Sequence, residues 1–236
     1  MKNNFDISNK KVAIIGCKNW ASSVIERFKE KTSVITIGED KQCDFTVNVT
    51  KDDDWYKLKD KIEEEKIKFD GLVTIGKVSE IDGLITMPAD KWIKIVSENL
   101  RIIYQGVDTL SDFINSNGSI VNILEIGSME GLGGGSKYEL FEKESRVLLR
   151  GFANSLAVKK VRINALRIGF VETEKQEGAN KKLREIFKKT AEKNIPLKTV
   201  GSLDDITSTI IYLISDASKL ITGEEIHIDG GAHIET

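Results

Sequence analysis

Tyr138 is the residue in this sequence whose neighbours most directly suggest chemistry. It stands in the stretch GSKYELFEKES, which follows a run of glycines and has the pattern of a helix start. A lysine one helical turn away would lower the pKa of the phenol and let it act as a proton donor. Here the residue four positions on is Glu142, while the lysines are Lys137 and Lys143. Lys143 is turned about 100° away around a helix, so a carboxylate is the expected helical neighbour.

The segments around this stretch alternate between strand and helix patterns. Strands buried on both faces appear as short apolar runs. Such runs occupy 11–16, 33–38, 44–50, 69–76, 118–126, 161–169 and 224–231. Helical patterns lie between them, so the sequence predicts a doubly wound α/β fold in a single Rossmann-type domain over 1–236. We expect a seven-stranded, mainly parallel sheet with helices on both faces.

Composition and charge exclude several classes of protein. The 236 residues carry a formal net charge of -2 with 31% charged side chains, so no general attraction to nucleic acid or an anionic membrane is expected. No run approaches the roughly 20 apolar residues of a membrane span, and no signal peptide is expected. The two cysteines indicate reduced thiols in a cytoplasmic protein. His227 and His233 are assigned no role, and no metal site is expected.

The ordered segments resemble the short-chain dehydrogenase/reductase family over nearly the whole chain. The resemblance is strongest in RINALRIGFVET and in the closing stretch IPLKTVGSLDDITSTIIYLISDASKLITGEEIHIDGG. Tyr138 also stands at the family's usual distance before RIN. The resemblance, which is to the 3-oxoacyl-(acyl-carrier-protein) reductase type, implies interconversion of alcohols and carbonyls with NAD(H) or NADP(H). It further implies a catalytic serine, a tyrosine, a lysine four residues after it and an asparagine on the preceding helix.

Matched to that pattern, the catalytic positions are Tyr138, Asn99, Glu125 and Glu142. Tyr138 and Asn99 agree with the family, whereas Glu125 stands at the serine position and Glu142 at the lysine position. Two carboxylates would disfavour the phenolate, so Tyr138 is predicted to stay protonated well above neutral pH. The glutamates could instead share a proton, giving one carboxyl a raised pKa and an acid role. The favoured interpretation is that they are ordinary polar residues in a cleft that has lost its reaction.

The first turn, where the resemblance implies a pyrophosphate, reads IIGCKNWASS and keeps one glycine. If Trp20 takes a glycine position, its indole would occupy the space of the phosphates. If Ala21 and Ser23 take those positions, each side chain intrudes on a close approach. The favoured alternative is a plain strand–helix turn with Trp20 covering the sheet edge. The candidate contacts in this turn are Gly16, Cys17, Asn19, Trp20 and Ser22.

Later strand ends carry the remaining cofactor candidates, Asn48, Val49, Gly76, Gly169 and Thr173. The family often has Asp-Val where this chain has Asn48-Val49, and an amide could still form a hydrogen bond there. Beyond the second strand, Glu39 or Asp40 would bind a ribose 2′-hydroxyl and repel a 2′-phosphate. NAD(H) is therefore expected over NADP(H) if any cofactor binds, although the altered first turn makes binding doubtful.

Three functions remain open from the sequence. The first is a catalytically impaired or inactive family member that keeps the fold for binding or assembly. The second is a working NAD(P)(H)-dependent oxidoreductase with a non-standard catalytic set. The third is a small-molecule binding module or non-redox enzyme that uses Glu125 and Glu142. Because the family pairs helices like 92–110 and 146–158 between subunits, a homodimer or homotetramer is predicted.

Overall fold

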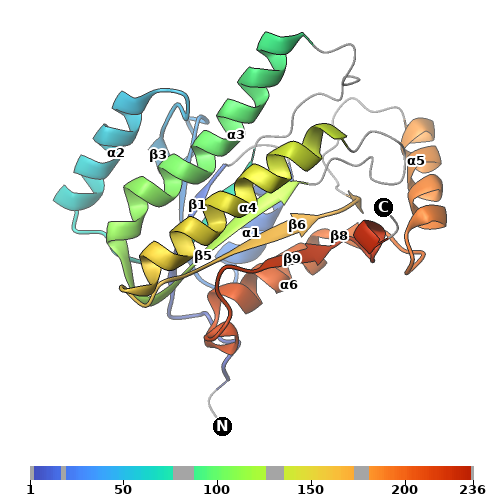
Figure 1. Ribbon diagram of the computed structural model, residues 1–236. Coiled ribbons are helices and arrows are strands. Elements are labelled where there is room, and N and C mark those ends of the chain that lie inside the picture. The colour runs from blue at the N-terminus through green and yellow to red at the C-terminus, as the bar shows by residue number, and fades with distance from the viewer. Residues whose placement is uncertain (1–2, 17–19, 77–87, 126–135, 173–180, 235–236) are drawn as a thin grey trace.

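In the computed structural model, residues 3–16, 20–76, 88–125, 136–172 and 181–234 are described, and they are organised around one sheet (Figure 1). All neighbouring strands in this seven-stranded sheet are parallel, in the order β3-β2-β1-β4-β5-β6-β9. This confirms the predicted fold class. The strands are β1 (Lys11–Ile15), β2 (Ser33–Gly38), β3 (Phe45–Thr46), β4 (Phe69–Ile75), β5 (Ile114–Glu125), β6 (Arg162–Ile168) and β9 (Glu225–Ile228).

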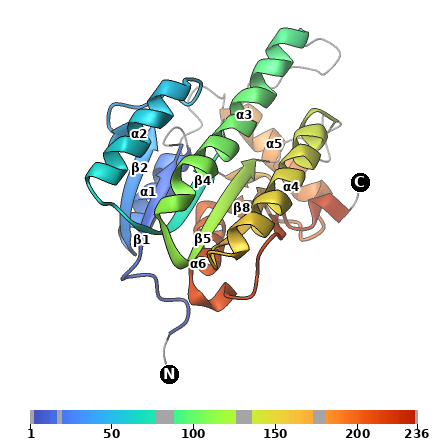
Figure 2. The same cartoon turned by 60° about the vertical axis from the view of Figure 1, so that its left-hand side comes forward.

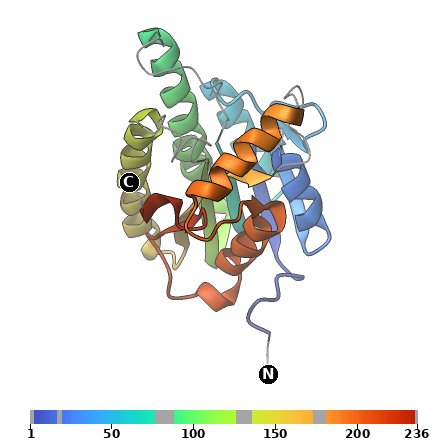
Figure 3. The same ribbon diagram turned by 90° about the vertical axis from the view of Figure 1, so that its right-hand side faces the viewer.

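Helices cover both faces of the sheet. One face packs against α2 (Asp52–Glu64), α3 (Ala89–Leu110) and α4 (Ser136–Ala157), which lie in front of the strands in Figure 2. The other face packs against α1 (Trp20–Lys29) and α6 (Leu203–Ile214), and Figure 3 shows them with α5 (Lys181–Asn194) beside them. None of the helices, as far as their residues are described, has the length and apolar character needed to cross a membrane.

The central strands are apolar on both sides because both sides are covered. In β1, Ala13 and Ile15 belong to the core under α2, α3 and α4, whereas Val12 and Ile14 belong to the core under α1 and α6. All four side chains are fully buried. A strand buried on both faces needs a continuous apolar run rather than an alternating one, which is why the strand was visible in the sequence.

Three predicted strands differ from the structure by more than one residue at an end. The last of them, predicted over 224–231, ends at Ile228. The third strand is two residues long, Phe45–Thr46, rather than 44–50. The chain leaves the sheet there because Asn48 turns it toward α2: its backbone N–H donates to Asp54 Oδ2 over 3.0 Å. The fifth strand begins at Ile114, four residues before the predicted start.

Gly106 brings α3 close to the sheet. A Cβ atom at this position would lie 2.7 Å from Ile15 Cδ1 and 3.3 Å from Thr74 Cγ2. Asn99 precedes Gly106 by seven residues, about two helical turns, and so shares its face of α3. The close approach therefore directs the Asn99 position toward the ends of β1 and β4.

Candidate functional site

The carboxyl ends of β1, β4, β5 and β6 meet at one edge of the sheet. The chain runs outward from β1 through β2 and β3, then crosses back to β4 on the other side of β1. The neighbouring ends of β1 and β4 are therefore a topological switch point, where open α/β sheets bind ligands. The residues that end or directly follow these four strands are Gly16, Gly76, Glu125 and Gly169.

Gly16 makes the turn out of β1 in a conformation that favours glycine. Its φ is +99°, and a Cβ atom would lie 2.5 Å from the carbonyl oxygen of Ile75 at the end of β4. Its N–H donates to the Ile37 carbonyl over 3.0 Å. The backbones of β1 and β4 thus approach as closely as a glycine permits at the switch point.

The rest of the predicted phosphate turn is described in part. Cys17 and Asn19 lie outside the described residues, as does the side chain of Trp20, whose backbone begins α1. Ala21 is 2% exposed and packs in the core beneath α1, while Ser22 is half-buried. Ala21 therefore serves helix–sheet packing rather than projecting into the turn.

Asn99 lies against the backbone at the end of β4. Its side chain is buried, and a Cβ atom on Gly76 would lie 2.9 Å from Asn99 Oδ1. The Gly76 N–H donates to the Ile123 carbonyl of β5 over 3.3 Å. The structure therefore places the side-chain amide of Asn99 at the switch-point edge, next to Gly76. A residue larger than glycine at position 76 would displace this amide.

A buried polar pair joins β4 and β5 just below this edge. The Thr74 hydroxyl donates to Asn122 Oδ1 over 2.7 Å, and both side chains are 2% exposed or less. Sequence reasoning missed Asn122. An asparagine inside the apolar run SIVNILEI was the available signal, because a buried amide needs a partner in a neighbouring strand.

Asn48 and Val49 form the turn between β3 and α2. Asn48 Oδ1 accepts hydrogen bonds from the Thr50 N–H at 3.0 Å and the Thr50 hydroxyl at 2.7 Å. Val49 is buried, and its carbonyl accepts from Trp55 Nε1 over 3.2 Å. The amide oxygen of Asn48 is thus already engaged in its own turn.

The end of β2 carries the two acids considered for ribose recognition. Asp40 is exposed, and its Oδ1 accepts from the Gln42 N–H over 3.0 Å. Asp40 therefore already caps its own turn. Glu39 is half-buried and directly follows the strand.

Gly169 joins the ends of β6 and β9. Its N–H donates to the Ile228 carbonyl over 3.0 Å, and a Cβ atom would lie 2.5 Å from the Cβ of Asp229. The glycine is therefore required by the approach of β9. Thr173, the last cofactor candidate, lies outside the described residues.

The backbone positions of the predicted catalytic residues are described, but apart from Asn99 their side chains are not. Tyr138 and Glu142 both belong to α4, where a spacing of four residues places them on the same face of the helix. Glu125 is the last residue of β5, in register with Ile168 of β6. Whether the four candidate side chains meet is thus outside the described structure.

An ion network that the sequence analysis did not anticipate links α4 to the sheet. Glu225 on β9 accepts from Arg167 of β6 at 2.6 Å and from Arg146 of α4 at 2.6 Å. Arg146 follows Glu142 by four residues, one helical turn. The available signal was Arg167 itself, an arginine inside the apolar strand RINALRIG, because a buried guanidinium needs a carboxylate partner.

No group of three or more histidine, cysteine, aspartate or glutamate side chains in the described part of the chain could hold a metal ion.

With this geometry established, comparison with known proteins decides the family. A family model described as enoyl-(acyl carrier protein) reductase matches residues 10–233, a span that includes all seven strands and the switch point. The chain belongs to the short-chain dehydrogenase/reductase family. The resemblance proposed from the sequence is thereby confirmed.

Curated relatives of this short-chain dehydrogenase/reductase are similar at low identity. A 3-oxoacyl-(acyl-carrier-protein) reductase of Thermotoga maritima is 29% identical over 189 residues, covering 79% of this chain and 75% of the relative. The enzyme of the same name from Staphylococcus epidermidis is 26% identical over 231 residues, covering 96% of this chain and 89% of the relative.

Solved structures of the family share the fold. The ligand-free aldohexose dehydrogenase of Thermoplasma acidophilum superimposes with a TM-score of 0.84 at 21% identity, over 98% of this chain and 96% of that one. A short-chain dehydrogenase family protein of Francisella tularensis gives a TM-score of 0.79 at 22% identity, over 96% and 100%. At these identities the likeness establishes the fold.

Members of the family generally bind NAD(H) or NADP(H). The described residues of this short-chain dehydrogenase/reductase fit a dinucleotide in part. Gly16 keeps a glycine conformation at the switch point, and Gly76 with Asn99 borders it.

Proposed function

We propose that this protein has lost or greatly reduced the carbonyl reduction of its family and keeps the fold for binding or assembly. The observation that carries the proposal is the position of Glu142 on α4, one helical turn after Tyr138, where the family has its lysine. The last residue of β5 is Glu125, at the family's serine position. At both positions, a carboxylate stands where the family has a group that supports proton transfer.

The electrostatic argument rests on the ionisation of the tyrosine. A free tyrosine has a pKa of about 10. The family chemistry needs a nearby cation to lower that pKa, so that proton transfer can occur near neutral pH. A carboxylate one turn away has the opposite effect, because it opposes the phenolate. Loss of a positioned acid typically costs about 100- to 10,000-fold in rate.

The nearby arginines do not replace the missing lysine in this proposal. Arg146 and Arg167 already bind Glu225. Arg146 is eight residues after Tyr138, about 12 Å along the helix axis. A cation that is neutralised and two turns distant contributes little to the ionisation of the phenol.

A working NAD(P)(H)-dependent oxidoreductase is the second candidate function. Two observations favour it: Asn99 is buried beside Gly76, and Gly16 has a positive φ. Both agree with the backbone arrangement expected at a dinucleotide site. Under either candidate we propose NAD(H) as the preferred cofactor, because Glu39 would repel a 2′-phosphate. The candidates differ in whether hydride transfer follows binding.

The deciding experiment combines binding with a restored catalytic set. Purified protein is titrated with NADH and NADPH, and NADH oxidation is then followed with a 3-oxoacyl thioester. We expect no turnover by the natural protein and a gain of at least about 100-fold over background in a Glu125→Ser/Glu142→Lys variant. Glu144→Lys makes the same charge change on α4 two residues from Glu142, and this control should gain nothing.

Two results would overturn the proposal. Turnover by the natural protein at about 1 s⁻¹ or faster, an ordinary enzymatic rate, would establish the second candidate function. A Glu125→Ser/Glu142→Lys variant that folds, binds NADH and still shows no turnover would mean that the two carboxylates are not what removed the reaction. Binding of neither cofactor at millimolar concentration would leave assembly or another small molecule as the retained role.

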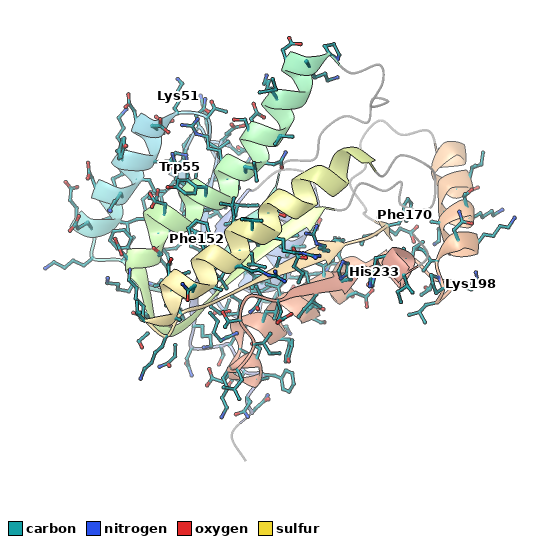
Figure 4. The ribbon with its side chains drawn as sticks, viewed as in Figure 1. Lys51, Trp55, Phe152, Phe170, Lys198 and His233 are labelled. Carbon is teal, nitrogen blue, oxygen red and sulfur yellow. The ribbon has the colours of Figure 1, made fainter. Side chains whose placement is uncertain are left out.

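We also propose that the protein is a cytoplasmic homodimer or homotetramer. Family relatives are commonly dimers or tetramers. Apolar side chains stand exposed on α3 and α4, including Tyr104 at 49% and Val147 at 71%. The Tyr104 ring lies 5.9 Å from that of Phe152, which is labelled in Figure 4. We expect light scattering to show an oligomer that Val147→Glu dissociates. Val158→Glu, at an 85% exposed site beyond the end of α4, is the matched control.

A further inference from the structure

The surface of α5 carries a concentration of positive charge that the rest of the chain lacks. Residues 181–198 contain seven lysine or arginine residues and two glutamates, although the whole chain has a formal net charge of -2. The remainder of the chain is therefore net acidic. α5 lies at the outer margin of the molecule (Figure 1), beside α1 and α6 (Figure 3), so the oligomer interface proposed at α3 and α4 does not use it.

One side of α5 faces solvent. Ile186, Lys189 and Lys193 follow one another at spacings of three and four residues, which places them in one stripe along the helix. All three are exposed, Ile186 at 52%. Ala191 on the opposite side and Ile195 directly after the helix are buried. We call Ile186, Lys189 and Lys193 the outer stripe of α5.

The positive charge of the outer stripe is not neutralised by described neighbours. Within the part of the chain that the structure describes, neither lysine of the stripe forms an ion pair. Lys188 differs, because its Nζ lies 2.7 Å from Glu172 Oε2, and the hydrogen bond to Glu172 and the charge of Glu192 raise its pKa. Glu185 is exposed beside the stripe. Two lysines against one acid leave this side of the helix with an excess of positive charge.

Two large aliphatic side chains stand exposed beyond the end of α5. Leu197 and Ile234 are each 72% exposed. The Leu197 N–H donates to the Gly230 carbonyl over 3.1 Å. A Cβ atom on Gly231 would lie 3.6 Å from Ile234 Cδ1 and 3.2 Å from Pro196 Cγ. The two side chains thus come from segments that pack against each other, and we call Pro196, Leu197 and Ile234 the apolar tip.

Lysines combined with aliphatic residues fit a lipid surface better than a protein partner. Protein–protein interfaces are depleted in lysine and enriched in aromatic residues and arginine. At a bilayer surface, the apolar stems of lysines lie along the acyl chains while their ammonium groups reach the headgroups, and aliphatic side chains insert. Lys198, directly after Leu197, adds a third ammonium group, and its Nζ donates to the Lys193 carbonyl at the end of α5 (Figure 4).

We propose that the outer stripe of α5 and the apolar tip form a peripheral docking surface for a membrane that contains anionic lipid. The ammonium groups of Lys189, Lys193 and Lys198 bind the headgroups. Ile186 and the apolar tip enter the boundary of the acyl chains. Because the tip packs against the turn directly after β9, docking brings the carboxyl end of β9 close to the lipid. The proposal does not depend on whether the protein reduces a carbonyl.

Cosedimentation of the full-length protein with lipid vesicles tests this surface. Vesicles of phosphatidylserine and phosphatidylcholine in equal parts are compared with vesicles of phosphatidylcholine alone, which carry no net charge. Each lysine near an anionic surface strengthens binding by about fivefold, so we expect binding to the mixed vesicles to be at least about 25-fold tighter. Binding should weaken as NaCl is raised, because salt screens the attraction.

The charges of the outer stripe are tested by a matched pair of variants. Lys189→Gln/Lys193→Gln removes two charges and should weaken binding to the mixed vesicles by about 25-fold. Lys57→Gln/Lys61→Gln makes the same change at the same spacing on α2, where both lysines are also exposed, and should leave binding unchanged. All four positions are at the surface, and circular dichroism checks that both variants keep the fold.

The apolar tip is tested separately from the charges. Leu197→Ser should weaken binding to the mixed vesicles by about tenfold, as expected for loss of one buried leucine side chain. Leu220→Ser, at a 90% exposed site in the turn before β9, is the control and should have no effect. Equal effects in the two leucine variants would remove the tip from the surface.

Three results would overturn the proposal. The first is a natural protein that does not sediment with the mixed vesicles. The second is an equal loss of binding in the α5 and α2 lysine variants. The third is binding to soluble poly-glutamate without binding to vesicles, which would assign the outer stripe to an acidic protein instead.

Discussion

Arg167 and Glu225 form an ion pair that is almost completely removed from solvent. Nη2 of Arg167 lies 2.6 Å from Oε1 of Glu225, and their side chains are 2% and 7% exposed. Arg146 binds the second carboxylate oxygen from α4. Burial raises the pKa of Glu225, but the hydrogen bonds and charges of the two arginines outweigh it, so the pKa is lowered. The ionised carboxylate connects β6, β9 and α4.

Removing the charge of Glu225 should strongly destabilise the fold. In Glu225→Gln the buried Arg167 guanidinium loses its counter-charge, and breaking such a pair from one side costs about 3–5 kcal/mol. Urea unfolding measures the loss. Asp204→Asn is the control, because Asp204 binds Arg27 with 79% of its side chain exposed and such pairs contribute at most about 1 kcal/mol. Equal effects in the two variants would contradict a structural role for the buried pair.

The stabilisation from Glu225 should depend on pH in a defined direction. Its pKa in the folded protein lies below the ordinary value of 4.5, so the unfolded chain binds its proton first as pH falls. The contribution is therefore complete above the ordinary pKa and is lost as pH falls through the lowered one. We expect the stability difference between the natural protein and Glu225→Gln to be constant from pH 7 to about pH 5.5 and to shrink below pH 4.5. A stability difference between the two proteins that grows as pH falls would contradict the lowered pKa of Glu225.

Two glycines should respond oppositely to alanine. Gly16→Ala forces a Cβ to 2.5 Å from the Ile75 carbonyl oxygen at a φ of +99°, which should destabilise the protein by about 2 kcal/mol or more. Gly151 lies on α4, and a Cβ atom there would meet no other atom within 4 Å among the described residues. Gly151→Ala should therefore stabilise the protein by about 0.5–1 kcal/mol. Thermal unfolding of both variants is the measurement, and a neutral Gly16→Ala would refute the close approach of β1 and β4.

The buried pair between β4 and β5 should be sensitive to the loss of one hydroxyl. Thr74→Val keeps the shape but leaves Asn122 Oδ1 without the hydroxyl donor, which costs about 1–3 kcal/mol for a buried group. Thr209→Val is the comparison, because the Thr209 hydroxyl donates to the Asp205 carbonyl at an exposed site. Its effect on unfolding in urea should stay within about 0.5 kcal/mol. A Thr74→Val effect of the same size would mean that Asn122 finds another donor.

Local pattern was sufficient for much of the fold. The apolar run at Val12–Ile15 identified a strand buried on both faces, and the parallel order follows from the helices between strands. Asn99 was matched to the family's helix asparagine, and the structure places its side chain next to Gly76 at the end of β4. The third strand was overestimated because a turn at Asn48 overrides a β-like composition.

The sequence by itself determined the family and the layered fold, since both follow from residue types and their spacings along the chain. Tertiary structure decided which distant polar residues became partners. Arg167 meets Glu225 across 58 residues, and Thr74 meets Asn122 across 48. His233, which local pattern assigned no role, stacks on His227 because two positive-φ glycines reverse the chain. Such pairings depend on where folded elements bring their side chains, and buried polar groups must find partners there.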